Sequence, residues 1–508
     1  MHTNNPPIAL IILDGWGYRE DPTNNAIHIA KTPNFDRLWA EYPHTLLEAS
    51  GESVGLPEGQ MGNSEIGHMT IGAGRQIYAD LVRISNAIKT GDFAKNQIFL
   101  DMFNHVKNHN STLHVQGLVS PGGIHSHTDH LIAFLRVAQA QGVKQIAIHA
   151  FTDGRDTSPT SARDYLTTLE NTLAEIGIGF IATVSGRFYA MDRDQNWDRL
   201  ARAEEALFAP HEKITTTRKP SEIIAEMYNN DIFDEHIEPV VFADGSGKTF
   251  PIRENDAVFF FNFRADRAKM ISQKILERTL NKNVFFATMT EYDKNLSALV
   301  AYPPENIEAT LAGEISAHNY SQAHIAETEK FAHATYFLNG GRTEPHKEEK
   351  HILIESRKDV KTHDEAPEMR AREITDKAIE EIERGTDFIF INYANPDMVG
   401  HTANVPAIIR AIETVDTEMG RFVDAIIAKG GTAYITADHG NAEVNVDPMT
   451  GEKHTAHTLN PVPLIITQKN VILRPHGTLA DITPTILDQM QIPRPLSMTG
   501  MDLTYLEG

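Results

Sequence analysis

Short apolar runs, each followed by a polar or glycine-rich turn, recur along the chain. The first, Ile8–Leu13, is continuously apolar, which is typical of a parallel strand buried on both faces. It ends in Asp14-Gly-Trp-Gly17, and the run at 431–436 ends in Ala437-Asp-His-Gly-Asn441. Ligands gather beyond the carboxyl ends of strands in an open α/β sheet. Both turns are therefore candidate site positions, although a polar turn without function has the same local pattern.

The middle of the chain repeats an apolar strand, a charged loop and a helix, and so predicts a second α/β unit. Its strands are predicted at residues 113–119, 145–151, 179–184, 257–261 and 284–289. Arginine, aspartate and histidine occur in the loops directly after these strands. This unit therefore carries a candidate site of its own.

The last part of the chain returns to strands and amphipathic helices. Helices are predicted at residues 365–384 and 406–429, and strands at 387–393 and 462–467. The second helix has one apolar stripe, formed by Ile408, Ile412, Val415, Met419, Phe422 and Ile426. The strand Ile8–Leu13 has no obvious partner near it in sequence, so we expect it to join the C-terminal sheet.

We therefore expect an α/β fold of two domains, with one inserted into the other. Residues 1–78 and 306–508 form the first domain in this prediction, and residues 79–305 form the inserted one. This layout places Asp14, Asp397 and Asp438 at neighbouring strand ends. The two crossings of the chain between the domains are expected to form a hinge.

The composition excludes several classes of function. The chain has 508 residues and a formal net charge of −23, which argues against a nucleic-acid or anionic-membrane partner. It has no cysteine, so disulfides, thiolate metal sites and a cysteine nucleophile are excluded. The run Ile8–Leu13 is too short for a signal sequence or a membrane span, and we expect a cytoplasmic protein. In so acidic a protein, an anionic substrate requires a local cluster of Arg and Lys.

Six side chains match the ligand preferences of divalent ions such as Mn²⁺ and Zn²⁺. They are three carboxylates and three imidazoles: Asp14, Asp397, Asp438, His401, His439 and His457. Asp397 and His401 are four residues apart, so on a helical turn they share one face. Two ions held by such ligands stabilise both the attacking and the leaving oxygen of a phosphoryl transfer. Taken singly, each of these residues is more often a satisfied turn or core residue.

Ser64 is the candidate nucleophile. The chain has no cysteine, and the flanking Gly62 and Gly67 permit close approach of the backbone to a ligand. Coordination of the Ser64 hydroxyl to a metal lowers the pKa of that hydroxyl towards neutrality. The alternative is that Ser64 only caps a helix that begins at Glu65.

A second candidate cluster consists of arginines that follow the strands of the inserted domain. They are Arg155, Arg187, Arg193, Arg264 and Arg267. Guanidinium groups bind phosphate and carboxylate groups through paired hydrogen bonds. Asp156 and His125 lie in the same loops and are candidates to orient a substrate hydroxyl or to move a proton. The alternative is that each arginine caps a helix or pairs with a local acid, and Asp266 between Arg264 and Arg267 is such an acid.

Together these motifs closely resemble those of the cofactor-independent phosphoglycerate mutases, members of the alkaline phosphatase superfamily. The matching stretches, in family order, are Leu13-Asp-Gly-Trp-Gly17, Gly62-Asn-Ser-Glu-Ile-Gly-His68, Gly122-Gly-Ile-His-Ser-His127, Thr152-Asp-Gly-Arg-Asp156, Ser185-Gly-Arg187, Asn262-Phe-Arg-Ala-Asp-Arg267, Asn395-Pro-Asp-Met-Val-Gly-His401 and Thr436-Ala-Asp-His-Gly-Asn441. The resemblance implies an alkaline-phosphatase-like metal domain built from both chain ends, with an inserted phosphotransferase domain that binds the substrate. It also implies interconversion of 3-phosphoglycerate and 2-phosphoglycerate through a phosphoserine on Ser64, without 2,3-bisphosphoglycerate.

The resemblance assigns residues to two Mn²⁺ ions and to the substrate. One ion is assigned to Asp397, His401 and His457, and the other to Asp14, Ser64, Asp438 and His439. The phosphoglycerate is assigned to His125, Arg155, Asp156, Arg187, Arg193, Arg264, Arg267 and Lys330. Asp156 is expected to deprotonate the glycerate hydroxyl. We expect a monomer whose inserted domain closes to exclude water, since water entry makes such an enzyme a phosphatase.

Two alternatives remain open from the sequence. Another enzyme of the same superfamily, a phosphohydrolase or a phosphopentomutase, would use the same metal ligands. The arginines of the inserted domain fit a small, doubly anionic acid better than a ribose phosphate. The second alternative is a non-catalytic metal-binding module that senses phosphorylated metabolites, in which a nucleophile at Ser64 has no use.

Overall fold

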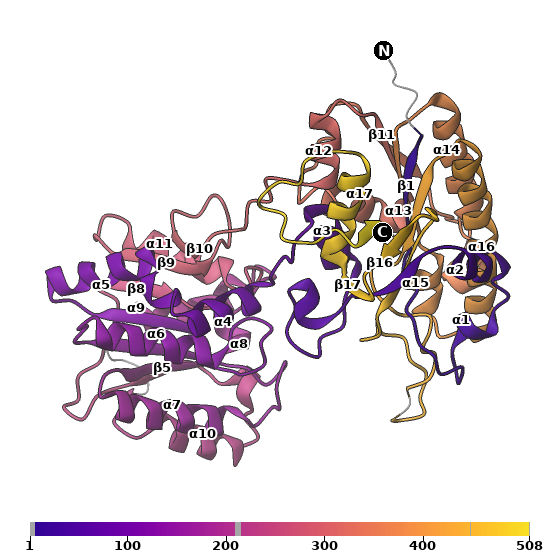
Figure 1. The fold of residues 1–508 in the computed structure, drawn as a ribbon. Coiled ribbons are helices and arrows are strands. Elements are labelled where there is room, and N and C mark those ends of the chain that lie inside the picture. The colour runs from indigo at the N-terminus through magenta and orange to yellow at the C-terminus, as the bar shows by residue number, and fades with distance from the viewer. Residues whose placement is uncertain (1–5, 209–214, 448, 507–508) are drawn as a thin grey trace. The chain divides into compact units, whose positions relative to one another are not determined.

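The computed structural model describes residues 6–208, 215–447 and 449–506. The chain divides into two compact units, one within Met1–Ala79 and Asn306–Gly508, the other within Asp80–Glu305. Each is an α/β unit with a largely parallel sheet and helices on both faces, as the alternating sequence pattern predicts (Figure 1). In the described residues, no helix is both long and apolar enough to cross a membrane.

In the described part of the first unit, eight strands form one sheet in the order β12-β11-β13-β1-β14-β15-β2-β17. Neighbours from β12 to β14 are parallel, whereas β15 is antiparallel to β14 and β2. The strands are β1 Ile8–Leu13, β2 His44–Glu48, β11 Gln322–Glu327, β12 Glu349–Ile354, β13 Phe388–Tyr393, β14 Thr432–Thr436, β15 Val462–Ile466 and β17 His476–Thr478. A small ribbon pairs β16 Val471–Leu473 with β18 Thr504–Leu506. The prediction that the first strand joins the C-terminal sheet is confirmed, since β1 lies between β13 and β14.

Helices cover both faces of this sheet. In Figure 1, α14 and α16 lie on one side of β1, and α3, α12 and α17 lie on the other. The helices are α1 Ala26–Ile29, α2 Pro33–Glu41, α3 Ser64–Ala73, α12 Leu311–Ala317, α13 Thr328–Ala332, α14 Ala371–Arg384, α15 Asn395–Gly400, α16 Val405–Ala428 and α17 Ile482–Gln489, with the short turns η1 Gly51–Val54, η4 His333–Phe337, η5 His363–Glu365 and η6 Leu479–Asp481. The apolar stripe predicted on α16 is fully buried in the core, which confirms that helix and its face.

One predicted helix begins later than expected. The pattern predicts a helix from residue 365, but α14 starts at Ala371. Pro367 lies between, and a residue before proline is disfavoured in the helical region. The intervening chain instead forms η5 and a turn in which Met369 has a positive φ of 42°.

The described part of the second unit also has an eight-stranded sheet, in the order β10-β9-β8-β3-β4-β5-β7-β6. Its strands are β3 Leu113–Leu118, β4 Ile146–Thr152, β5 Phe180–Gly186, β6 Thr215–Thr216, β7 Val240–Phe242, β8 Ala257–Phe260, β9 Phe285–Thr290 and β10 Leu299–Tyr302. Its helices are α4 Asp80–Thr90, α5 Gln97–His109, α6 Thr128–Ala140, α7 Ala162–Ile176, α8 Arg187–Ala190, α9 Trp197–Phe208, α10 Pro220–Tyr228 and α11 Lys269–Thr279, with η2 Phe93–Lys95 and η3 Asp234–His236. Each strand predicted in this region is present.

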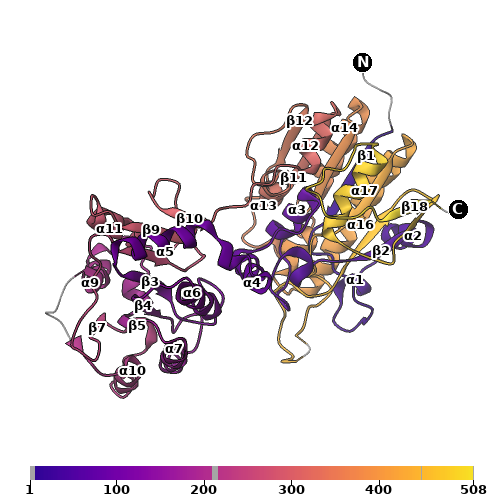
Figure 2. The ribbon, with the colours of Figure 1, turned by 60° about the vertical axis from the view of Figure 1, so that its left-hand side comes forward.

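Two apolar cores enclose the second sheet. The helices α5, α6 and α7 pack on one face, and α9 and α11 pack on the other. Figure 2 shows α6 and α7 on one side of β3, β4 and β5, with α9 on the opposite side. The loops after β3, β4, β5 and β8 therefore leave the sheet at one edge, as expected for parallel strands.

Candidate active site

Three carboxylates meet at the carboxyl edge of the first sheet. β1 runs parallel to β13 with Leu13 opposite Tyr393, and parallel to β14 on its other side. Asp14, Asp397 and Asp438 follow these three strand ends, and each is at most 2% exposed. The predicted convergence of these residues is thus confirmed, whereas their role as metal ligands stays a prediction.

The turn after β1 requires glycine at position 15. Gly15 has a φ of +77°, and a Cβ atom there would lie 2.8 Å from the backbone of Asp397. The Gly15 N–H also donates a hydrogen bond to Asp438 Oδ1 at 3.3 Å. A side chain at this position would therefore push the carboxylates apart.

A first ligand set consists of Asp397, His401 and His457. The pairs formed by Asp397 Oδ1, His401 Nε2 and His457 Nε2 are each 3.2 Å apart. The other ring nitrogens donate to carbonyls, His401 Nδ1 to Thr455 at 2.7 Å and His457 Nδ1 to Gly62 at 2.8 Å. These bonds direct the two Nε2 atoms at the carboxylate, as second partners of metal-bound histidines do.

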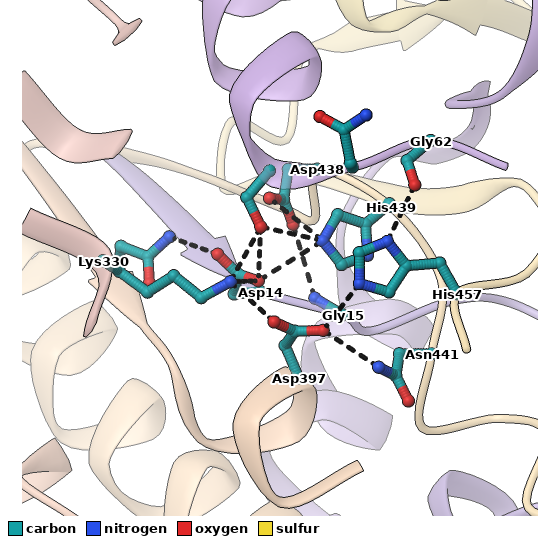
Figure 3. A network of polar contacts seen from close by, with 12 residues as sticks. Asp14, Gly15, Gly62, Lys330, Asp397, Asp438, His439, Asn441 and His457 are labelled. Carbon is teal, nitrogen blue, oxygen red and sulfur yellow. Dashed lines mark hydrogen bonds and ion pairs between the residues drawn. The ribbon is translucent and has the colours of Figure 1, made fainter. Parts of the chain in front are cut away.

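A second ligand set surrounds His439 Nε2. Ser64 Oγ lies 3.0 Å from this nitrogen, Asp438 Oδ2 3.5 Å and Asp14 Oδ1 3.6 Å. Ser64 Oγ also lies 3.4 Å from Asp14 Oδ1. Figure 3 shows Asp14, Asp438 and His439 converging on one point, with Asp397 and His457 beside them.

Both ligand sets fit divalent ions. Two ligand atoms that are each about 2.1 Å from one ion lie roughly 3.0 to 3.4 Å apart, which is close to the separations within both sets. Carboxylate, imidazole and hydroxyl donors suit Mn²⁺, Zn²⁺ and Co²⁺. The charges of the site also favour bound cations. Burial and the neighbouring Asp438 raise the pKa of Asp14 above its ordinary value, because the negative charge of this carboxylate is only partly compensated. Three buried carboxylates need more positive charge than one lysine provides.

Lys330 is the ammonium group of this cluster. It enters from α13, which follows β11, and its Nζ donates to Asp397 at 2.6 Å and to Asp14 and Ser64 at 2.7 Å. Burial lowers the pKa of Lys330, but the carboxylates of Asp14 and Asp397 raise it well above its ordinary value overall. Lys330 therefore stays charged beside the Ser64 hydroxyl. It lies in the first unit, among the carboxylates, whereas the arginines assigned with it lie in the second.

Ser64 is the first residue of α3 rather than its cap. The cap is Asn63, whose side chain accepts a hydrogen bond from the Ile66 N–H. The alternative reading of Ser64 as the capping residue is therefore wrong. Asn63 provides the acceptor for a free N–H group at the start of the helix, so the Ser64 hydroxyl is available to interact with the carboxylates and His439.

In the second unit, Arg187 is the centre of a separate polar cluster. Its Nη1 donates to Asp153 and to Asp156, both at 2.6 Å, and its Nη2 donates to His125 Nε2 at 2.9 Å. Burial and the Arg187 charge lower the pKa of His125 to about 4, so this ring is neutral at pH 7. Because Arg187 donates to Nε2, the ring proton of His125 is on Nδ1.

Arg155, Arg187 and Arg267 line one cavity of about 200 Å³. Burial and the charges of Arg193, Arg187 and Arg155 lower the pKa of Arg267, so four guanidinium groups lie close together. Arg193 and Arg264 pair with Asp266, at 2.9 Å and 3.0 Å. The predicted pairing with a local acid thus holds for these two, and it also holds for Arg187 with Asp153 and Asp156 and for Arg155 with Glu235 at 3.6 Å.

Sequence reasoning missed several residues that hold these clusters. Asp153 is buried and accepts hydrogen bonds from Ser120 Oγ at 2.9 Å and from the Asp156 N–H at 3.0 Å, besides its bond to Arg187. It directly follows β4, the same signal that identified Asp156. Asn392 donates to Asp14 Oδ2 at 2.8 Å. It lies within the buried strand β13, and the apolar pattern of that strand does not indicate a polar residue that contacts the site.

Comparison with known proteins gives concordant matches over the whole length. A model of the metalloenzyme superfamily matches residues 6–494. Two curated relatives named 2,3-bisphosphoglycerate-independent phosphoglycerate mutase, from Listeria innocua serovar 6a and Clostridioides difficile strain 630, are 47% and 48% identical. Each alignment covers 98% of this chain and 99% of the relative. A crystal structure of Leishmania mexicana phosphoglycerate mutase at low cobalt concentration has a TM-score of 0.58 and 30% identity, covering 99% of this chain and 98% of that one.

Proposed function

Since the chain belongs to the 2,3-bisphosphoglycerate-independent phosphoglycerate mutase family of isomerases, within the metalloenzyme superfamily, we propose that it interconverts 3- and 2-phosphoglycerate through a phosphoserine on Ser64. The first unit is the phosphoryl-transfer domain in this proposal, and the second unit is the domain that binds the glycerate. The reaction needs no added 2,3-bisphosphoglycerate, because the enzyme itself carries the phosphoryl group between the two half-reactions.

The position of Ser64 Oγ is the observation that carries the proposal. This hydroxyl is buried, accepts a hydrogen bond from Lys330 and lies 3.0 Å from His439 Nε2. A charged donor stabilises the alkoxide form of serine, which is the nucleophile of a phosphoryl transfer. A sensor or a purely structural metal site gains nothing from such a serine.

The metals are two Mn²⁺ ions in this proposal, one in each ligand set. Divalent ions bound there supply charge that lowers the pKa of the Ser64 hydroxyl and neutralises the phosphoryl oxygens. The protein fixes the ligands through the carbonyls of Thr455 and Gly62, which accept from the two histidines, and through the amide of Asn392, which donates to Asp14. Lys330 adds a further positive charge where the transferred phosphoryl group binds.

In the first half-reaction, Ser64 Oγ gives up its proton and bonds to phosphorus while the ester bond to the glycerate breaks. The released glycerate oxygen takes a proton. In the second, the other hydroxyl of the same glycerate gives up its proton, with Asp156 as the base, and attacks the phosphoserine. The bond to Ser64 Oγ then breaks and this oxygen takes a proton, so the two protons lost, by Ser64 and by the second hydroxyl, are matched by the two gained.

The glycerate must stay bound between these steps, and the arginine cluster is suited to hold it. Guanidinium groups pair with the carboxylate of the acid, and Arg155, Arg187 and Arg267 present several of them in one cavity. The neutral His125 lies beside Asp156, and Arg187 donates a hydrogen bond to each of these two side chains and so fixes their orientation. Arg193 and Arg264 are held beside the same group by Asp266.

The proposal is tested by incubating the purified protein with 3-phosphoglycerate and Mn²⁺ in the absence of 2,3-bisphosphoglycerate. We expect 2-phosphoglycerate to form in the equilibrium ratio, with free phosphate as a minor product. Chelation should stop the reaction, and Mn²⁺ should restore it. Free phosphate as the main product would indicate a phosphohydrolase, and turnover of ribose 1-phosphate instead would indicate a phosphopentomutase.

Asp153→Asn tests the cluster of the second unit. Removing one of the two carboxylates that orient Arg187 should raise the KM for 3-phosphoglycerate about tenfold or more. It should also lower the free energy of unfolding by roughly 2 to 3 kcal/mol, since a buried ion pair loses one partner. Kinetics and urea unfolding measure the two effects. Asp164→Asn is the matched control, because its ion pair with Arg163 lies on the surface and both measurements should stay unchanged.

A further inference from the structure

A separate cluster of two histidines and a glutamate lies on the edge strands of the first sheet. In the parallel pair β11 and β12, Gln322 lies opposite Glu349, and His324 lies opposite His351. Side chains two residues apart on a strand share a face, so these four polar groups are all on the same face. Glu349 and His324 are buried, whereas the His351 side chain is 14% exposed. Figure 2 shows β12 at the margin of the sheet beside β11.

The three ionisable side chains are within ligand distance of one another. Glu349 Oε1 is 2.7 Å from His351 Nε2 and 3.6 Å from His324 Nδ1. One ligand atom of each residue lies within 4.8 Å of the others. Two imidazoles and one carboxylate are also the composition of the first ligand set, and they form a familiar zinc ligand set in proteins.

The hydrogen bonds around His324 leave one of its nitrogens facing two oxygens. Gln322 donates its amide N–H to the Ala312 carbonyl at 2.8 Å, so its Oε1 atom faces His324 Nε2 at 3.1 Å. His324 Nε2 therefore carries the ring proton, and Nδ1 of the neutral ring has a lone pair. Nδ1 lies 2.9 Å from the Ala334 carbonyl oxygen and 3.6 Å from Glu349 Oε1. A lone pair facing two oxygens in a buried site requires a cation between them.

The Ala334 carbonyl is directed at this position by the helical turn η4, His333–Phe337. Leu338 N–H donates to the His333 carbonyl, and Asn339 N–H donates to the Thr335 carbonyl. Neither of these two N–H groups bonds the carbonyl of Ala334, because the turn changes from π-helical to α-helical spacing there. Its carbonyl is thereby turned towards His324 as a fourth oxygen or nitrogen donor.

We propose that His324, Glu349, His351 and the Ala334 carbonyl bind a divalent ion of the zinc class, as a structural site separate from the two ligand sets described above. Two nitrogen and two oxygen donors suit the tetrahedral coordination of Zn²⁺. The second partners are in place, since Glu349 accepts from Asn339 Nδ2 at 2.7 Å and His324 Nε2 donates to Gln322. The partly exposed ring of His351 gives the ion a path from solvent.

Such an ion would fasten the segment that carries Lys330. η4 directly follows α13, and Ala334 is four residues beyond Lys330. Linking its carbonyl to β11 and β12 fixes the end of that segment against the sheet. The rival occupant of the same position is a second proton on His324, which would make the cluster a buried ion pair.

Substitution of His351 by cysteine distinguishes a bound divalent ion from a second proton on His324 by absorption spectroscopy. The chain has no cysteine, so a Co²⁺–thiolate absorption band in His351→Cys arises at this position alone. We expect chelator-treated His351→Cys to develop this band when Co²⁺ is added. His318→Cys is the matched control, because His318 is an exposed residue at the end of α12, and it should show no band.

The unsubstituted chain and His351→Gln provide the second measurement. After metal removal, addition of Zn²⁺ and gel filtration, we expect His351→Gln to retain one equivalent of Zn²⁺ less than the unsubstituted protein. His318→Gln should retain the full amount. Equal metal content in all three proteins, together with no thiolate band in His351→Cys, would overturn the proposal and identify the cation as a proton. Neither readout depends on enzymatic turnover, so failure here leaves the proposed mutase function untouched.

Discussion

Ser64→Ala is expected to lower the rate of phosphoglycerate interconversion by roughly 10⁴-fold or more, because the proposed nucleophile is lost. The fold should survive. Lys330 keeps its bonds to Asp14 and Asp397, so the change removes about 1 kcal/mol from the free energy of unfolding. Initial rates with 3-phosphoglycerate measure the first effect, and urea unfolding measures the second.

The same variant identifies the covalent intermediate. Acid quenching during turnover, followed by mass spectrometry, should find phosphate on Ser64 in the unsubstituted protein and on no residue of Ser64→Ala. Ser53→Ala is a suitable control, since Ser53 lies in η1 and its hydroxyl bonds only a local carbonyl, that of Ser50. Turnover retained by Ser64→Ala would rule out the phosphoserine route.

Lys330→Met is expected to separate three properties of the site. Without metal, the carboxylates of Asp14 and Asp397 lose their ammonium partner, which should cost about 3 kcal/mol of stability. The loss stays near this level because burial and Asp438 raise the pKa of Asp14, which eases uptake of a proton. Turnover should fall by roughly 10³-fold, since one charge that stabilises the phosphoryl group is gone.

Mn²⁺ affinity should change in the opposite direction. Removing a positive charge from among the carboxylates reduces repulsion of a divalent ion, so Lys330→Met should bind Mn²⁺ as tightly as the unsubstituted chain or more tightly. Calorimetric titration of the metal-free proteins measures this. Lys347→Met, on the exposed segment before β12, should match the unsubstituted protein in all three assays. Weaker Mn²⁺ binding with unchanged turnover would contradict the role assigned to Lys330.

The sequence alone located nine of the eighteen described strands, among them β1, β13 and β14, and the residues that follow them. A continuous apolar run marks a buried parallel strand wherever it occurs, and the polar residue after it lies at the carboxyl edge. Asp14, Asp397 and Asp438 were therefore predictable as neighbours once the first strand was placed in the C-terminal sheet. The apolar stripe on α16 was equally predictable, because helical periodicity is a local property of the sequence.

Helix ends were less predictable, as α14 shows. Its apolar pattern extends back to residue 365, but Pro367 stops the helix from forming there, and the start moves to Ala371. Ser64 shows the same limit, because either of two adjacent polar residues satisfies the pattern of a cap. Only the hydrogen bond from Ile66 identifies Asn63 as the residue that does so.

What the tertiary structure decided is which long-range partners each side chain meets. Lys330 follows an ordinary strand in a polar run, yet its extended side chain reaches Asp14 after β1, Ser64 on α3 and Asp397 on α15. Asp153 and Asp156 carry the same local signal, and their shared bond to Arg187 depends on the adjacency of β4 and β5. His324 and Glu349 become a cluster only through the register of β11 and β12. Strand order and register are set by the packing of the whole core, so residues far apart in sequence gain their chemistry only after the chain has folded.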